Sequence, residues 1–215
     1  MDYVRSHGYP APAVEEISPD GLELVMERID GPSMVEGIKR RPWSLHHQGA
    51  LLATLHRRLH DIAGPEWLPV SAVGTGEVLV HLDLHPLNVI LSPTGPVVID
   101  WPNARRGDGA VDVALTWVLL ASGDVPTGAL WGAIMAKARQ RLIAGFMSPF
   151  DRGAVTRELR AVVTWKVKDP HMSEVEQARM WSMVDAAEVD ARGNARGVDK
   201  TSGTDRGHAG SGTEP

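Results

Sequence analysis

The sequence contains no cysteine and no apolar run long enough to cross a bilayer. The absence of cysteine excludes disulfide scaffolds, thiolate zinc sites and cysteine nucleophiles. The longest apolar stretch, residues 113–121, is too short for a transmembrane helix and directly follows Asp112. The first residues lack the apolar centre of a signal peptide. We therefore expect a cytoplasmic protein without a membrane partner.

A strong positive charge is also missing. The formal net charge is −5, so the composition gives no support to a nucleic-acid partner. Hydrophobic residues make up 43% and charged residues 23% of the 215 positions, which is the ordinary balance of a globular protein. This length suffices for one large domain or for a small lobe with a larger one.

Residues 1–8 can form the end of a helix, and two short strands are expected at 14–17 and 22–29. Ser18-Pro19-Asp20-Gly21 between the strands is a turn sequence, because proline presets its backbone angle and glycine tolerates a positive one. A helix is predicted from about Ser44, as its N-cap, to Ile62, with leucines repeating on one face.

Short runs of branched residues predict further strands at 78–80, 89–91 and 97–99. The pattern then changes to helix, and helices are predicted at about 109–121, 127–146, 151–167 and 173–190. The tail 191–215 has almost nothing to bury and is predicted to be disordered. The strands are local hairpins without regular βαβ alternation, which indicates an α+β fold.

Three polar residues follow or precede predicted strands in one part of the chain: Asp83, Asn88 and Asp100. Phosphoryl transfer needs a carboxylate that orients and deprotonates a hydroxyl, and hard oxygen ligands for Mg²⁺. Asp83 fits the first role, and Asn88 and Asp100 fit the second. An asparagine five positions after the catalytic aspartate is also the spacing of a kinase catalytic loop. The alternative is that Asp83 and Asn88 only form turns.

His81, Asp83, Pro86 and Asn88 resemble the catalytic loop of the aminoglycoside phosphotransferase and choline kinase-like family. Ile99-Asp100-Trp101 resembles that family's counterpart of the Asp-Phe-Gly metal site. The resemblance implies ATP or GTP as phosphate donor, Mg²⁺ as cofactor and a small molecule with a hydroxyl group as substrate. It gives His81 a structural role in the loop.

Two more segments resemble this family. Asp112 is similar to a helix aspartate that braces the catalytic loop, although a carboxylate near a helix start is also favoured by the helix dipole. Residues 24–28 resemble the strand that leads into the hinge between two lobes. The resemblance implies that adenine meets the backbone at the hinge, which comprises Met26, Glu27, Arg28 and Ile29.

The implied architecture is a protein-kinase-like fold with an incomplete N-terminal lobe, consisting of a hairpin and hinge at residues 1–30. A mainly helical catalytic lobe would span residues 31–190. The substrate is expected over the helices after residue 125, and its identity stays open because a fold does not fix a substrate. Acidic residues of the last predicted helix can attract a cation or simply face solvent; they are Glu174, Glu176, Asp185 and Glu188.

Before Leu24 the sequence has no lysine and no glycine-rich loop. The family places a phosphate-covering loop, a strand lysine and a helix glutamate ahead of the hinge. The resemblance therefore implies an N-terminally truncated chain whose phosphate contacts and activity are impaired. A genuinely short, non-catalytic pseudokinase is the alternative.

A metal-dependent hydrolase is a further alternative, because His81, Asp83 and His85 alternate and would share one face of a strand. His56 and His60 also have the helical spacing of a zinc pair. However, Arg57 stands where a zinc protease needs glutamate, and a proline follows His85.

Overall fold

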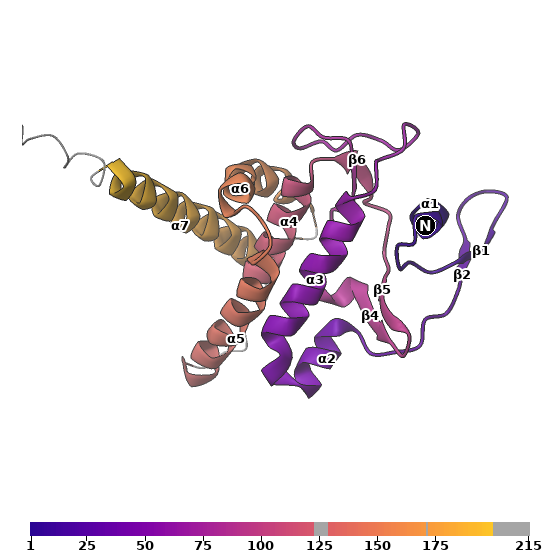
Figure 1. Ribbon diagram of the computed structural model, residues 1–215, viewed down its shortest axis with the longest axis horizontal. Coiled ribbons are helices and arrows are strands. Elements are labelled where there is room, and N and C mark those ends of the chain that lie inside the picture. Colours follow the sequence, from indigo (N-terminus) through magenta and orange to yellow (C-terminus); the bar gives the residue numbers. More distant parts are fainter. Residues whose placement is uncertain (123–128, 171, 200–215) are drawn as a thin grey trace, which may run out of the picture.

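The computed structural model describes residues 1–122, 129–170 and 172–199. The N-terminal part of the chain lies at one end of the molecule and holds one short helix and one hairpin (Figure 1). Its elements are α1 (Asp2–Ser6), β1 (Val14–Ile17) and β2 (Leu24–Met26). The proline-glycine turn joins β1 to β2 as expected, and both strands are largely exposed.

The larger remainder of the chain is mainly helical, and the predicted α+β fold is confirmed (Figure 1). Its helices are α2 (Met34–Arg40), α3 (Leu45–His60), α4 (Gly109–Ser122), α5 (Ala129–Met147), α6 (Arg152–Lys166) and α7 (Glu174–Asp199). Its strands are β3 (Val78–Val80), β4 (Val89–Ser92), β5 (Gly95–Val98) and β6 (Arg105–Gly107).

The described strands form three separate antiparallel pairs: β1 with β2, β3 with β6, and β4 with β5. In the β4–β5 hairpin Val89 lies opposite Val98. This register places the residues before β4 beside the residues after β5. The sequence did not predict β6, because Arg105-Arg106-Gly107 has no apolar alternation. It forms a strand through its pairing with β3 and its hydrogen bonds to residues 69–71.

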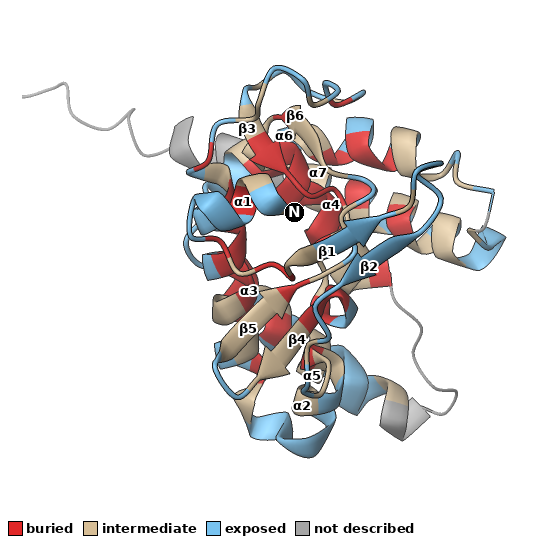
Figure 2. Ribbon diagram, turned by 90° about the vertical axis from the view of Figure 1, so that its right-hand side faces the viewer, coloured by how far each residue is buried: buried red, intermediate tan, exposed pale blue. Residues whose placement is uncertain are grey.

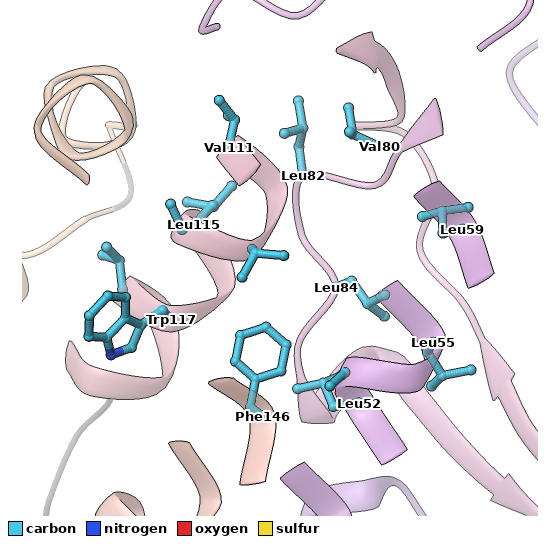
Figure 3. Close-up of a cluster of buried hydrophobic side chains, with 14 of the residues drawn as sticks. Leu52, Leu55, Leu59, Val80, Leu82, Leu84, Val111, Leu115, Trp117 and Phe146 are labelled. Atoms are coloured by element: carbon cyan, nitrogen blue, oxygen red, sulfur yellow. The ribbon is translucent and has the colours of Figure 1, made fainter. Parts of the chain in front are cut away.

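The core lies between α3, α4 and α5, and the segment that follows β3 passes through it (Figure 3). Leu84 of this segment lies beside Leu52 and Leu55 of α3, and Phe146 of α5 lies next to them. Leu82 lies at the other end of the cluster, beside Val80 and Val111. Helices α3 and α5 cross closely because each presents a glycine. A Cβ at Gly49 would collide with the backbone of Leu142, and one at Gly145 would collide with His46.

Three local predictions need correction. Ser44 precedes α3, but its hydroxyl donates to the carbonyl of Arg41 instead of accepting from the helix. Helix α2 was not predicted, because Gly31-Pro32 indicates a break; Ser33 and Glu36 nevertheless form a capping box there. Helix α7 continues to Asp199, beyond its predicted end near residue 190.

Two of the remaining predictions involve residues that the structure leaves out. Residues 127 and 128 of the helix expected from 127, and residues 200–215 of the expected disordered tail, lie outside the described residues. Within the described part of the chain, no helix combines the length and the apolar character needed to cross a membrane.

Candidate active site

The segment 81–88 leaves the sheet directly after β3 and is held in place by Asp112 of α4. The backbone N–H groups of His81 and Leu82 donate to the Asp112 carboxylate over 3.1 and 2.7 Å. Leu82 has φ of +59°, which a leucine rarely adopts. Its side chain is buried, so packing and the bond to Asp112 together stabilise this strained turn, which presents Asp83 beyond it.

Asp112 itself is fully buried and charged. Burial alone would raise its pKa, but a 3.0 Å hydrogen bond from Nε2 of His60 and the charges of nearby histidines hold the pKa below its usual value. A buried carboxylate needs such partners, because an unpaired one loses its hydration without compensation. Asp112 therefore joins α4 to the segment 81–88, and the bracing role that the family resemblance implies for it stays a prediction.

Asp83 and Asn88 contact each other across the loop. The amide nitrogen of Asn88 donates to the backbone oxygen of Asp83 at 2.9 Å and to its carboxylate at 3.2 Å. Both partners are acceptors, so the amide nitrogen must face them. The side-chain oxygen of Asn88 therefore points away from Asp83 and is the atom that can ligate a metal.

Asp100 follows β5 and reaches the same end of the hairpin as Asn88. The N–H of Ile99 donates to the carbonyl of Asn88 at 3.0 Å, which places Asp100 one residue beyond this contact. Asp100 is exposed and has φ of +67°. Positive φ at a residue other than glycine is often found at functional sites, where the surrounding structure maintains it.

His85 lies beside Asp83 and is influenced by the charge of Asp100. Its Nε2 is 3.5 Å from the Asp83 carboxylate, and its Nδ1 accepts from the N–H of Leu87 at 3.3 Å. Partial burial lowers the pKa of His85, and the charge of Lys166 adds to this, whereas Asp83 and Asp100 oppose it. The charges of Asp83 in the loop and of Asp100 after the hairpin therefore both affect the pKa of His85.

His81 has a different environment from His85. It is fully buried, its Nε2 donates to the carbonyl of Ile99 at 3.1 Å, and its ring packs against Trp101. Burial lowers the pKa of His81, although Asp112 opposes this. His81 thus joins the loop to the end of β5.

The hydrolase alternative required His81, Asp83 and His85 to share one face of a strand. However, β3 ends at Val80, and the positive φ of Leu82 interrupts any alternation. The described residues contain no cluster of three His, Cys, Asp or Glu side chains that could hold a metal ion.

The proposed zinc pair of α3 is engaged elsewhere. His56 contacts the carbonyl of Leu52 and the hydroxyl of Thr116, while His60 binds Asp112. The geometry therefore gives no basis for the hydrolase.

A magnesium site needs fewer protein ligands than a zinc site does. It usually keeps several waters and binds one or two carboxylates together with substrate phosphates. The amide oxygen of Asn88 and the carboxylate of Asp100 are hard oxygen donors of this kind. In donor chemistry these residues fit a magnesium site that phosphates would complete.

A cavity of about 820 Å³ opens beside Asp83 and His85. Its other walls come from α2, from the end of α4, and from α5, α6 and α7. This is the volume of a pocket for a small molecule. Helices α5, α6 and α7 of these walls lie after residue 125, where a substrate was expected; its binding there stays a prediction.

The predicted hinge residues lie apart from this cavity and do not contribute to its described lining. Met26 ends β2, and Glu27 is tied to Ala13 through its N–H and its carboxylate. Arg28 and Ile29 follow the last hydrogen bond of the hairpin. Whether this backbone contacts adenine stays a prediction.

Sequence reasoning missed most of the cavity walls. The capping box at Ser33 and Glu36 could have revealed α2, which contributes Val35 and Ile38. No sequence signal indicated Lys166, which lies far along the chain from Asp83.

Residues 67–149 match the family model described as the phosphotransferase enzyme family, APH. The solved structure of a choline/ethanolamine kinase family protein from Mesorhizobium loti is similar, with a TM-score of 0.50 and 14% sequence identity. The similarity covers 86% of this chain and 75% of that chain, and at this identity it concerns the fold alone. No curated protein sequence matches the chain.

Together the two findings confirm the resemblance to the aminoglycoside phosphotransferase and choline kinase-like family. Residues 67–149 are thus similar in sequence to a phosphotransferase family, and the fold is similar to that of a choline/ethanolamine kinase family protein.

Proposed function

We propose that the protein transfers the γ-phosphoryl group of ATP or GTP to a hydroxyl group of a small molecule. One observation carries this proposal: Asp83 lies on the wall of a large cavity and contacts Asn88, which shares one end of a hairpin with Asp100. Phosphoryl transfer requires a general base beside the substrate and oxygen ligands for a metal ion close to that base.

In this proposal Asp83 orients the substrate hydroxyl and accepts its proton. Asn88 and Asp100 hold Mg²⁺, which neutralises negative charge on the phosphates when bound. His81 and Asp112 position the loop. The nucleotide base would contact the hinge at Met26–Ile29, with residues 1–30 as one lobe and 31–190 as the other. A cytoplasmic location is part of the proposal, because the proposed phosphate donor is ATP or GTP.

The test is transfer of labelled phosphate from ATP to a panel of small alcohols, comparing the wild type with Asp83→Asn. Loss of the base should lower transfer at least about 100-fold, while the similar shape of asparagine should preserve the fold. Asp108→Asn is the matched control, since Asp108 accepts from the N–H of Ala110 at the start of α4, and asparagine caps helices equally well.

The control should retain transfer within about twofold, as expected for an interchangeable cap. Full activity of Asp83→Asn would show that Asp83 is not the base. No transfer to any alcohol, with Mg·ATP at millimolar concentration, would contradict the proposed reaction for this chain.

A further inference from the structure

The walls of the 820 Å³ cavity are mainly apolar, although Asp83 and His85 form one polar end. The apolar side chains come from several helices and from the segment before α7; they include Val35, Ile38, Leu119, Met135, Met172 and Met180. Methionine side chains are flexible and polarisable, so they adapt to apolar ligands of irregular shape. A cavity with this lining favours a ligand with a large apolar body.

Most charged side chains in the walls already have partners within the protein. Lys166 forms an ion pair with Asp169 at 3.1 Å. The carboxylate of Glu176 accepts from the N–H and the hydroxyl of Ser173, at 2.9 and 2.8 Å, at the start of α7. Lys39 adds an exposed cation on α2.

To pair with Asp169 or Glu176, a polycationic ligand would have to displace Lys166 or Ser173 from these carboxylates. It would also lose its own hydration, and losses of this kind commonly exceed the gain from a new ion pair. An uncharged ligand leaves all these contacts intact.

We infer that the phosphate acceptor is a largely apolar, uncharged alcohol whose hydroxyl lies at Asp83 and whose body packs against the methionines. The inference rests on the proposed function and narrows its substrate class. It distinguishes this cavity from one built for aminoglycosides or choline. It also assigns specificity to Met135, a residue remote from the loop that carries the reaction.

The experiment is an NMR titration of the full chain with 1-octanol, without nucleotide, recorded on backbone amides. Kanamycin, choline and 10-hydroxydecanoate serve as polycationic, monocationic and anionic comparison ligands. We expect 1-octanol to bind most tightly and to shift the amides of residues that line the cavity.

Two neighbouring residues of α5 provide matched variants. Met135 lines the cavity and is 39% exposed, whereas Ile134 does not line it and is 49% exposed. Both are exposed, so either can be replaced by glutamate without burying a charge. Met135→Glu should weaken 1-octanol binding roughly 10-fold, because apolar contact is lost and a charge enters the wall. Ile134→Glu should leave binding unchanged.

Tighter binding of any charged ligand, or unchanged octanol binding by Met135→Glu, would overturn the inference. Failure of the proposed function has a different signature: octanol binds as expected, but no alcohol receives phosphate. Conversely, transfer to kanamycin or choline would support the proposed function and contradict the apolar acceptor.

Discussion

The β1–β2 hairpin and the segment 81–88 differ in what holds them. The hairpin is exposed (Figure 2), and its turn is stabilised by local hydrogen bonds, such as those that Ser18 makes. The segment is largely buried and is fixed by Asp112, about thirty positions later in the chain. Local contacts therefore specify the hairpin, whereas the proposed catalytic loop depends on long-range contacts in the core.

The largest effect should come from removing the brace of the segment. Asp112→Ala leaves two backbone N–H groups and His60 without their buried acceptor. We expect the free energy of unfolding, measured in urea, to fall by about 3–5 kcal/mol. Asp61→Ala, an exposed carboxylate after α3, is the control and should change it by less than about 0.5 kcal/mol. A loss below about 1 kcal/mol for Asp112→Ala would show that Asp112 does not hold the segment in place.

Substitution of one leucine in each region tests how much the segment and the hairpin contribute to stability. Leu84 is 0% exposed in the segment, and Leu22 is 84% exposed in the hairpin. Leu84→Ala should destabilise the protein by about 2–5 kcal/mol through lost burial and a residual cavity. Leu22→Ala should stay within about 0.5 kcal/mol. Similar losses in the two urea denaturations would show that the hairpin is as tightly integrated as the segment.

The third prediction concerns pH and His56, which packs beneath the segment. Burial lowers the pKa of His56 to about 4, although the nearby Asp112 opposes this. The unfolded chain, with a histidine pKa of about 6.5, takes up the proton first as the pH falls. This group alone should therefore reduce the free energy of unfolding by about 2 kcal/mol between pH 7 and pH 5.

Variants at two positions of α3 isolate this contribution. His56→Gln should lose about 2 kcal/mol less than the wild type does over the same pH interval. His47→Gln, at an exposed position, should follow the wild type. An unchanged pH dependence in His56→Gln would show that His56 is not the group responsible.

The smallest predicted effect lies at the junction between the two regions, where Ser33 caps α2. Its hydroxyl accepts from the N–H of Glu36 at 3.2 Å. Ser33→Ala should therefore cost about 1 kcal/mol in thermal or urea unfolding. Ser44→Ala is the matched control, because Ser44 precedes α3 without capping it. If both variants lose the same stability, the capping box does not explain α2.

The features predicted from the sequence are those that short-range rules specify. The turn at Ser18–Gly21 identified the hairpin, and leucine periodicity identified the buried face of α3. Asp83 and Asn88 were predicted together because Asn88 follows Asp83 by five positions on one loop. The β4–β5 hairpin then brings Asp100 to Asn88, which the short strands already suggested.

The features that were missed depend on contacts between distant residues. Strand β6 depends on its pairing with β3 and on hydrogen bonds to Pro69 and Ser71, and its Arg-Arg-Gly sequence gives no strand signal. The apolar character of the cavity arises where α2, α5 and α7 meet, so no single periodicity encodes it. Lys166 and Asp169 reach the wall through the docking of α6 against α4, which single-sequence patterns do not specify.

The most direct test of the account is calorimetric titration of ATP into the full chain, with and without Mg²⁺. Wild type should bind ATP at least about 10-fold more tightly with Mg²⁺, because Asn88 and Asp100 would share the metal with the phosphates. Asp100→Asn should lose most of this difference while keeping its fold, since asparagine tolerates positive φ. Equal ATP affinity of the wild type with and without Mg²⁺ would contradict a shared metal and phosphate site.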